Sequence, residues 1–307
     1  MNSTIYPKIT VVTPSFNQGA FLEETILSVL GQGYPNLEYI IIDGGSSDES
    51  VEIIRRYEDR LAYWQSKSDG GQSDAINQGF DRATGAILAW LNSDDFYLPG
   101  TLFSVARKLR SGVPQILFGN CIQICEGGTK VSGSDVEAGH TRLDLPFVDY
   151  IIQPSSFWTR QAWDLTGKLD HKLHYVFDWD WYIRAQQAGV MLTPETRYLS
   201  VYRLHKSHKT GMGGNKRLTE IAEVLTRYAG RQYGDLYRYL STFRGKYNSI
   251  RRIEKWISRL RLTRYHTAFL RLRFPILFRG LSDRQLASLL RMVEPAEKIP
   301  LATEVAR

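Results

Sequence analysis

Polar side chains, most of them acidic, follow each of four short apolar segments in the first hundred residues. A single Asp or Asn in such a place is usually explained by its preference for loops and helix caps, but the repetition over four segments favours a shared role in ligand binding. Such side chains offer hydrogen bonds to a polar ligand and, through their carboxylates, contacts to a cation. The residues in question are Asn17, Asp43, Asp69 and the run Asn92-Ser93-Asp94-Asp95.

The segments that precede these residues have the pattern of buried strands, and helical patterns lie between them. This alternation predicts an α/β fold with a mostly parallel sheet flanked by helices on both faces. Because ligands bind beyond the carboxyl ends of the strands in such sheets, we expect the polar residues to meet at one edge. Strands are expected at Lys8–Thr13, Leu37–Ile42, Leu61–Gln65 and Ala86–Leu91, and helices at Ala20–Leu30, from about Glu49, and at Ser73–Ala83.

The composition is that of an ordinary globular protein. Of 307 residues, 43% are hydrophobic and 23% are charged, which excludes a disordered, collagen-like or small disulfide-rich protein. No apolar run approaches the ~20 residues that span a bilayer, and the first residues lack a secretory signal, so we expect a cytoplasmic protein. Cys121 and Cys125 lie about 13 Å apart on an expected strand, too far for a disulfide, and we interpret them as small buried hydrophobic residues.

Charge divides the chain into two parts. Residues 213–307 contain 20 Lys and Arg and 8 Asp and Glu, a net charge of +12, whereas residues 1–212 contain 19 basic and 24 acidic residues, a net charge of −5. We therefore expect an α/β domain at 1–212 and a basic α-helical region at 213–307. In this region Ile250, Ile253, Ile257 and Leu260 keep helical spacing among several arginines, and Pro275 interrupts the later part.

Ordered motifs in the first two thirds of the chain resemble glycosyltransferase family 2. The similarity runs from about Lys8 to about Gly211 and implies the GT-A fold, which is a Rossmann-like arrangement of sheet and helices. It also implies transfer of a sugar from a nucleotide-diphosphate sugar with inversion, assisted by a divalent metal, Mn²⁺ or Mg²⁺. Uridine is the most frequent nucleotide of the family, and deoxythymidine and guanosine are the alternatives. The motifs are TPSFNQGAFLEETILSVLGQGYPNLEYIIIDGGSSDES, SDGGQSDAINQGF, AILAWLNSDDFYLPG and FDWDWYIR.

The resemblance implies where the metal and the donor bind. Family members usually have Asp-x-Asp where this chain has Asn92-Ser93-Asp94-Asp95, so the metal is assigned chiefly to Asp94, with Asp95 as its partner and His205 as a third ligand. Asp43 would contact the nucleoside. The other donor-binding residues would be Thr13, Pro14 and Phe16 around the base, Asn17, Asp69, Gly70, Gln72 and Asn92 beside the base, ribose and sugar, and Arg203 and Lys209 at the phosphates.

The nucleophile would be an acceptor hydroxyl, which needs a base. Phe177 replaces the first acid of a family acid pair and Asp178 matches the second, so Asp178 is the predicted base. Asp180 lies about 200° further around a helix and is expected either to support the helix start or to pair with Arg184 at i+4. The acceptor is predicted to enter near Ser155, Trp158 and Trp179.

These residues together predict an inverting, metal-dependent glycosyltransferase that builds a cell-surface polysaccharide on a glycan or lipid-linked saccharide acceptor. The basic helices would dock on an anionic membrane, making the enzyme peripheral on the inner face, or pack on the catalytic domain or on a second copy in a homo-oligomer. They show no nucleic-acid-reading motif, so we expect no nucleic acid partner.

Two alternative functions remain. A sugar nucleotidyltransferase would need a Gly-rich basic loop after the first strand, which Pro14-Ser15-Phe16-Asn17 does not provide. A degenerate binding or assembly subunit is favoured only by Asn92 and Phe177.

Overall fold

The computed structural model describes residues 6–125, 130–133, 136, 145–205, 208–209, 213–259 and 265–293. They divide into two compact units. The described residues up to 136 and from 150 to 208 form the first unit, and residues 145–149 with 209–293 form the second. The chain passes from the first unit to the second at 208–209, four residues before the predicted boundary between the acidic and the basic part at 212–213. The second unit also includes residues 145–149 from the middle of the chain.

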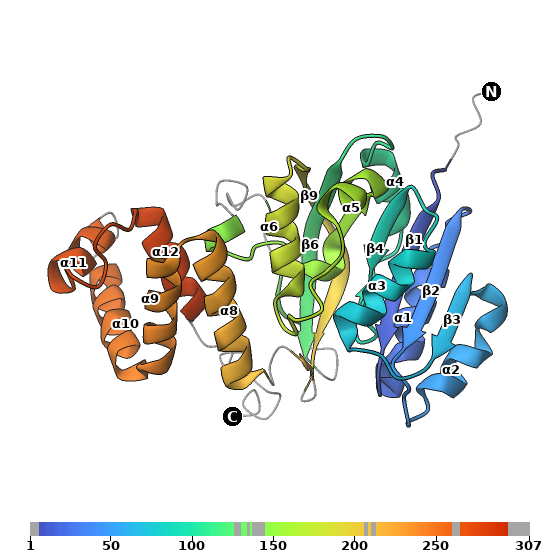
Figure 1. The fold of residues 1–307 in the computed structure, drawn as a ribbon, viewed down its shortest axis with the longest axis horizontal. Helices are drawn as coiled ribbons and strands as arrows, with labels where there is room; N and C mark the ends of the chain where they lie inside the picture. The colour runs from blue at the N-terminus through green and yellow to red at the C-terminus, as the bar shows by residue number, and fades with distance from the viewer. Residues whose placement is uncertain are drawn as a thin grey trace. The chain divides into compact units, whose positions relative to one another are not determined.

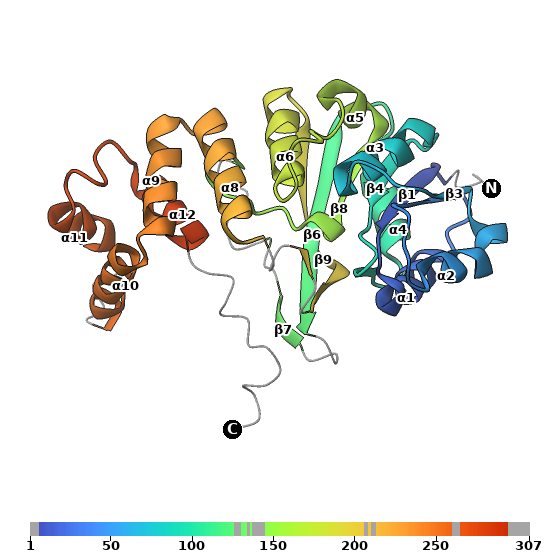
Figure 2. The same cartoon turned by 60° about the horizontal axis from the view of Figure 1, so that its bottom comes forward.

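The first unit is built on a nine-stranded sheet within the described residues (Figures 1 and 2). The order is β3-β2-β1-β4-β8-β6-β9-β5, with β7 paired to β6. Strands β1 to β4 are mutually parallel, as are β6 and β9, whereas β8, β5 and β7 run antiparallel to their neighbours. The predicted α/β fold is thus confirmed, with antiparallel strands added to the sheet. The strands are β1 (Ile9–Ser15), β2 (Leu37–Asp43), β3 (Tyr63–Ser66), β4 (Ile87–Trp90), β5 (Phe96–Tyr97), β6 (Gln115–Cys125), β7 (Lys130–Gly133), β8 (Ser156–Thr159) and β9 (Met191–Leu204).

Helices cover both faces of this sheet, which explains why β1 and β4 are buried along their whole length. All seven residues of β1 and all four of β4 are buried. Side chains of α1 (Gly19–Leu30), α2 (Ser50–Arg56) and α4 (Thr101–Lys108) share one core with alternate residues of β1, β2 and β4. Aromatic rings of α3 (Gln72–Arg82), α5 (Arg160–Thr166) and α6 (Phe177–Gln187) pack against tryptophans of β4 and β8.

A glycine lets α3 lie close to β1. A Cβ atom at Gly79 would come within 2.4 Å of Cγ1 of Val12, closer than any real contact. The close approach brings the first turn of α3, with Gln72, to the carboxyl edge of the sheet.

The predicted elements of the first unit agree with the structure to within two residues at most boundaries. The strand expected at Leu61–Gln65 is β3 at Tyr63–Ser66. Both cysteines are buried, which confirms that they pack as small hydrophobic residues, and they are not joined to each other by a disulfide. Three short 3-10 turns, Glu58–Arg60, Leu145–Phe147 and Gln153–Ser155, complete the described elements up to α6.

Strand β9 brings the end of the first unit back to the site. It runs parallel to β6, with irregularities of register around Asn120, and its last residues pair antiparallel with β5. Phe96 is opposite Val201 and Tyr97 is opposite Ser200. As a result, residues that follow β9 lie beside the residues that precede β5.

The second unit consists of helices packed on one another. Phe147 meets the ring of Tyr233 edge-on, and the hydroxyl of Tyr233 donates to the carbonyl of Gln285 at 2.8 Å. Four apolar residues were predicted to share one helical face, namely Ile250, Ile253, Ile257 and Leu260. Ile250 and Ile257 are buried in this unit, Ile253 is half-buried, and Leu260 lies outside the described residues. Among the described residues, no helix is long and apolar enough to cross a membrane. The helices are α8 (Gly214–Tyr228), α9 (Arg231–Thr242), α10 (Arg244–Arg259), α11 (His266–Arg273) and α12 (Asp283–Val293).

Candidate active site

The first four strands end at the same edge of the sheet. Ser15 pairs with Asp43, Asp43 pairs with Ser66, and Trp90 lies opposite Val12 in the middle of β1. The polar residues that follow these strands therefore emerge side by side, as expected for parallel strands.

Asp43 holds the loop that follows β2. One carboxylate oxygen accepts the N–H groups of Gly45 and Ser46 and the hydroxyl of Ser66, and the other accepts the hydroxyl of Ser46. The residue is 0% exposed, so a nucleoside could reach its carboxylate only by displacing these donors. We therefore assign Asp43 a positioning role in place of the predicted direct contact.

Three loops converge around Gly44. A Cβ atom there would lie 3.1 Å from Oδ2 of Asp69 and 3.3 Å from the ring of Phe16, and Phe16 is exposed. Asn17, in a left-handed conformation with φ 51°, donates its N–H to Ser46. Burial raises the pKa of Asp69, and its neighbouring carboxylates add to this effect. An exposed aromatic ring beside a carboxylate suits a ring-bearing ligand with polar groups.

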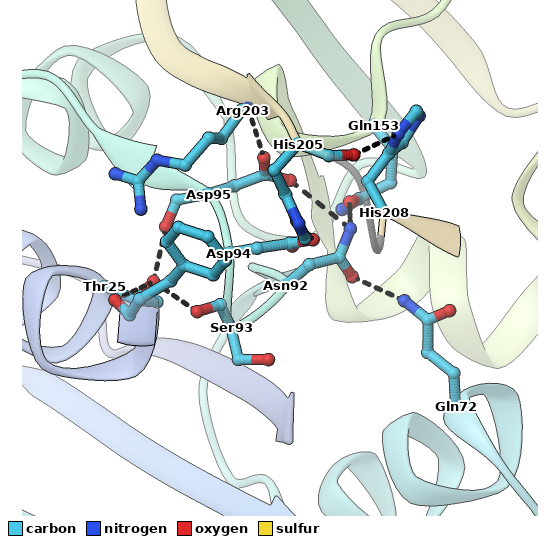
Figure 3. Close-up of polar contacts among 11 residues, drawn as sticks. Thr25, Gln72, Asn92, Ser93, Asp94, Asp95, Gln153, Arg203, His205 and His208 are labelled. Carbon is cyan, nitrogen blue, oxygen red and sulfur yellow. Dashed lines mark hydrogen bonds and ion pairs between the residues drawn. The ribbon is translucent and has the colours of Figure 1, made fainter. Parts of the chain in front are cut away.

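Three amides form a hydrogen-bonded chain across the edge of the sheet (Figure 3). Nε2 of Gln72 donates to Oδ1 of Asn92 at 2.7 Å, and Nδ2 of Asn92 lies 3.2 Å from Oε1 of Gln153. Nε2 of Gln153 donates to the carbonyl of Trp90 at 2.8 Å. Both ends of the Asn92 amide are therefore engaged, and its orientation is set by α3 and by the 3-10 turn before β8.

Asp95 anchors the end of β9. It is 0% exposed, and its Oδ1 accepts the backbone N–H of Arg203 at 3.0 Å, while its Oδ2 lies 3.4 Å from Nδ2 of Asn92. Burial raises the pKa of Asp95 well above its usual range, the neighbouring Asp94 adds to the effect, and these hydrogen bonds oppose it. A carboxylate enclosed in this way holds the end of β9 in place, and the predicted role of Asp95 as second partner of Asp94 at a metal stays a prediction.

Asp94 and His205 meet at the edge of the sheet although 111 residues separate them. Oδ2 of Asp94 lies 3.0 Å from Nε2 of His205, and the Asp94 side chain remains 19% exposed. Neighbouring ligands about 2.1 Å from an octahedral cation lie about 3 Å apart, so this pair fits two positions around Mn²⁺ or Mg²⁺. Because no group of three or more metal-binding side chains occurs among the described residues, phosphate oxygens or water would complete the coordination.

Arg203 brings a buried positive charge beside this pair. Its guanidinium donates to Oε2 of Glu24 at 2.6 Å and stacks over the rings of Phe21 and Phe96, at 4.9 and 5.2 Å from their centroids. The ring of Phe21 also packs 4.5 Å from that of His205. The site thus combines a carboxylate, an imidazole and a guanidinium, a set suited to a cation and a phosphate group.

The two acids at the start of α6 differ in their surroundings. Asp180 is fully buried and pairs with Nε of Arg184 at 2.8 Å, which confirms the expected i+4 pair. Asp178 is half-buried, and its Oδ1 accepts the N–H of Trp179 at 2.8 Å. Of the two, Asp178 is the acid that a substrate could reach.

Three residues predicted to meet the acceptor lie in the core. Ser155 is 0% exposed, with its hydroxyl 2.8 Å from the carbonyl of Asn120 and 2.6 Å from the Ser200 hydroxyl. Trp158 and Trp179 are also buried, and the ring of Trp158 packs among other aromatic rings. A sugar stacks only on an indole with an open face, so these three side chains would have to be uncovered to meet an acceptor, and their acceptor role stays a prediction.

The remaining predicted residues are dispersed around the edge. Thr13 is buried, and its hydroxyl lies 3.0 Å from that of Tyr39. It therefore belongs to the interior of the sheet edge, whereas Phe16 is exposed. Pro14 is buried beside it, and the N–H of Gly70 donates to Asp74. Lys209 is exposed and belongs to the second unit, and its phosphate role stays a prediction.

Sequence reasoning missed Glu24, Phe21 and Gln153. Glu24 and Phe21 lie on α1, where an acidic residue and an aromatic residue in the first turns look like ordinary helix composition. Gln153 precedes β8 in Gln153-Pro154-Ser155-Ser156, and that motif was assigned to the acceptor. The sequence did contain one signal for Gln153, since a polar residue directly before an apolar strand can lie at the edge of the sheet where the site is.

Comparison with known proteins agrees with this geometry. Residues 10–159 match the family model described as glycosyl transferase family 2. Over 110 residues the chain is 41% identical to an uncharacterized glycosyltransferase of Mycobacterium tuberculosis, covering 36% of this chain and 42% of the relative. Over 137 residues it is 33% identical to GalNAc(5)-diNAcBac-PP-undecaprenol beta-1,3-glucosyltransferase of Campylobacter jejuni, covering 43% and 44% of the two chains. The matches therefore span less than half the length of these relatives.

Solved structures show the same fold. Residues 1–349 of S. aureus TarS in complex with UDP-GlcNAc align with a TM-score of 0.59 at 15% identity, covering 94% of this chain and 90% of that one. The mannosyltransferase PcManGT from Pyrobaculum calidifontis, in complex with GDP-Man and Mn²⁺, aligns with a TM-score of 0.58 at 17% identity, covering 73% and 64%. At this identity the likeness establishes the fold alone.

Proposed function

We propose that this chain, whose residues 10–159 match the model of glycosyl transferase family 2, transfers a sugar from a nucleotide-diphosphate sugar to an acceptor hydroxyl. The observation that carries the proposal is the meeting of Asp94 and His205 at 3.0 Å, with Arg203 beside them, at the carboxyl edge of a parallel sheet. This edge is where an α/β sheet binds nucleotides.

Asp94 and His205 would hold a divalent cation, which when bound would neutralise the departing diphosphate. Arg203 would contribute a further positive charge near the phosphates, and its pairing with Glu24 keeps its guanidinium at the site. Phe16 would lie against the base, since its ring is exposed beside the loop that Asp43 orders.

Asp178 would act as the general base and take the proton of the acceptor hydroxyl as it attacks. Two observations support it over Asp180: Asp178 is only half-buried, whereas Asp180 is enclosed and neutralised by Arg184. A carboxylate that takes this proton on the face opposite the leaving group gives inversion at the anomeric carbon.

A uridine donor and a lipid-linked saccharide acceptor, in the synthesis of a cell-surface polysaccharide, are the finer parts of the proposal. UDP-GlcNAc is bound by one structural neighbour and GDP-Man by another. The name of the Campylobacter jejuni relative describes an undecaprenol-linked acceptor. Each of these is a property of another protein and supports the proposal by similarity.

The first test is thermal unfolding with UDP, GDP and dTDP, each with and without Mn²⁺. A ligand at 100 times its Kd stabilises the native state by about 2.7 kcal/mol, which would raise the Tm by about 5 to 10 °C. We expect one diphosphate to act, only with Mn²⁺, and Asp94→Ala to abolish the shift. Absence of any shift would contradict the proposal and favour a degenerate binding subunit.

The second test separates binding from chemistry. Asp178→Asn keeps the shape of the side chain and removes its basicity, so the Tm shift with donor should remain while turnover falls by at least about 100-fold. Asp164→Asn, an exposed acid on α5, is the matched control and should leave both unchanged. Full turnover by Asp178→Asn would refute the assignment of the base.

A further inference from the structure

The segment 244–279 concentrates the positive charge of the chain. It contains 11 Lys and Arg and a single acidic residue, Glu254. Glu254 is paired with Arg251 at 2.6 Å, so it neutralises only one of these charges. A second pair joins Arg271 to Asp283 of α12 at 2.9 Å. Since these two acids face a segment with 11 basic residues, its net charge remains strongly positive and favours an anionic partner.

The apolar stripe predicted on α10 is not the surface that meets such a partner. Ile250 and Ile257 are 0% and 1% exposed and pack within the second unit, where α10 contacts α9 and α11. A binding surface must therefore be formed by the opposite side of α10 and by neighbouring segments.

Large apolar side chains are exposed in this segment. Trp256 of α10 is 55% exposed, Leu272 of α11 is 81% exposed, and Ile276, in the turn after Pro275, is 89% exposed. The rings of Trp256 and Phe269 meet edge-on, with centroids 6.4 Å apart, which connects α10 to α11. Because Phe269 and Leu272 are separated by one turn of α11, Trp256 and Leu272 belong to one neighbourhood, and Ile276 follows Leu272 by four residues in the chain.

Basic side chains surround these apolar ones. Arg252, Lys255 and Arg259 are all exposed and lie within four residues of Trp256 on the same helix. On the other side, Arg273 and Arg279 are exposed next to Leu272 and Ile276. We call this set of three apolar and five basic residues the Trp256 surface.

We propose that the Trp256 surface docks on an anionic lipid bilayer. Long basic side chains place their charges at the headgroups, while Trp and aliphatic side chains enter the boundary of the acyl chains. A second copy of the chain would bring the same positive charge against it, and a nucleic acid would leave the aliphatic side chains of Leu272 and Ile276 without a role. This inference is independent of the proposed catalytic function, because binding to lipid needs neither donor nor metal.

Cosedimentation of the full chain with vesicles tests the proposal. We expect binding to vesicles of phosphatidylcholine with 30% phosphatidylglycerol at low salt, much weaker binding at 0.5 M NaCl, and little binding to pure phosphatidylcholine. Each basic residue near an anionic surface strengthens binding about fivefold, so Arg252→Gln with Arg259→Gln should weaken it about 25-fold.

Two further variants separate the apolar and charged contributions. Leu272→Ser with Ile276→Ser should weaken binding at least about tenfold. This loss should depend less on salt than the loss caused by Arg252→Gln with Arg259→Gln, because salt screens charges and does not screen apolar contacts. Leu272 and Ile276 are almost fully exposed, so the Tm should not change. Arg55→Gln with Arg107→Gln, which removes the same charge from exposed sites of the first unit, is the matched control and should bind as the unmodified chain does.

Three outcomes would overturn the proposal. The first is absence of binding to anionic vesicles at low salt. The second is equal loss of binding in the control and in the Arg252 and Arg259 variant, which would mean that total charge alone matters. The third is a shift from dimer to monomer on mutating Leu272 and Ile276 with lipid binding unchanged, which would assign the surface to a second copy of the chain. Since the nucleotide-dependent Tm shift is measured without lipid, either proposal can fail while the other stands.

Discussion

Asn92 stands where the resemblance to glycosyltransferase family 2 implies an aspartate, and replacing it tests how the site is held together. In the structure Nδ2 of Asn92 faces two oxygens, Oδ2 of Asp95 at 3.4 Å and Oε1 of Gln153 at 3.2 Å. Asn92→Asp replaces this donor by a carboxylate oxygen that faces both acceptors. Gln153 could turn its amide toward the new oxygen only by giving up its bond to the carbonyl of Trp90.

The stability lost in Asn92→Asp follows from the distance between the new carboxylate and that of Asp95. When both carboxylates are ionised, charge centres about 5 Å apart and an effective dielectric constant of about 20 give a repulsion of about 3 kcal/mol. Burial already raises the pKa of Asp95, so a proton shared by the pair would relieve part of this repulsion as the pH falls. With the lost hydrogen bond, which adds about 1 kcal/mol, Asn92→Asp should lower the stability of the first unit by up to about 4 kcal/mol, or its Tm by up to roughly 15 °C, with the larger loss at higher pH. A divalent cation between the carboxylates would offset much of this loss.

Thermal unfolding with and without Mn²⁺ measures both effects. Asn92→Ala is the control, because it removes the same hydrogen bonds without adding a charge, and it should cost only about 1 to 2 kcal/mol. Mn²⁺ should raise the Tm of Asn92→Asp more than that of the unmodified chain. If Asn92→Asp without metal were as stable as Asn92→Ala, the two carboxylates would not be in contact and the site as described would be wrong.

Two predictions concern charged groups that support the fold. Burial alone would raise the pKa of Glu38, but hydrogen bonds from Thr10 and Thr84 and the charge of a nearby lysine lower it. Its stabilisation is present at neutral pH and is lost as the pH falls through the lowered pKa. Urea unfolding should thus show Glu38→Gln less stable than the unmodified chain by about 1 to 2 kcal/mol at pH 7, and the two should become nearly equal once the pH lies below the lowered pKa of Glu38; a difference in stability that does not shrink with falling pH would contradict this reasoning. Arg184→Met removes the ion-pair partner of the fully buried Asp180 and should cost about 3 to 5 kcal/mol at pH 7 in the same assay, and Asp180→Asn added to it should recover part of the loss. No recovery would mean that the loss comes from the arginine's bonds to backbone carbonyls.

Local features of the chain were predictable because they depend on neighbouring residues. Continuous apolar runs that end at polar residues are typical of buried parallel strands, and β1, β2 and β4 follow that pattern. The pair of Asp180 with Arg184 follows from helical spacing alone. The gathering of strand ends at one edge follows from parallel pairing, which the helices between the strands require.

The chemical environment of each site residue depended on contacts between distant parts of the chain. His205 was assigned to the metal by resemblance, but its contact with Asp94 exists because β9 pairs with both β6 and β5. Nothing in the local sequence specifies that register. The same holds for the enclosure of Asp95 by the N–H of Arg203.

Burial was the property that sequence reasoning assigned least well. Trp158 and Trp179 were predicted to meet a sugar, yet both side chains pack inside the protein. For the apolar residues of the basic helices the sequence left a membrane, the catalytic domain and a second copy open, and Ile250 and Ile257 pack within the second unit. An apolar side chain favours burial in any apolar surrounding, and only the packing of the elements decides whether helices, strands or a ligand cover it. The sequence by itself therefore determined the strands, the helices and the edge where polar groups gather. The tertiary structure decided which of those groups stay open to a ligand, because exposure depends on what the rest of the chain covers.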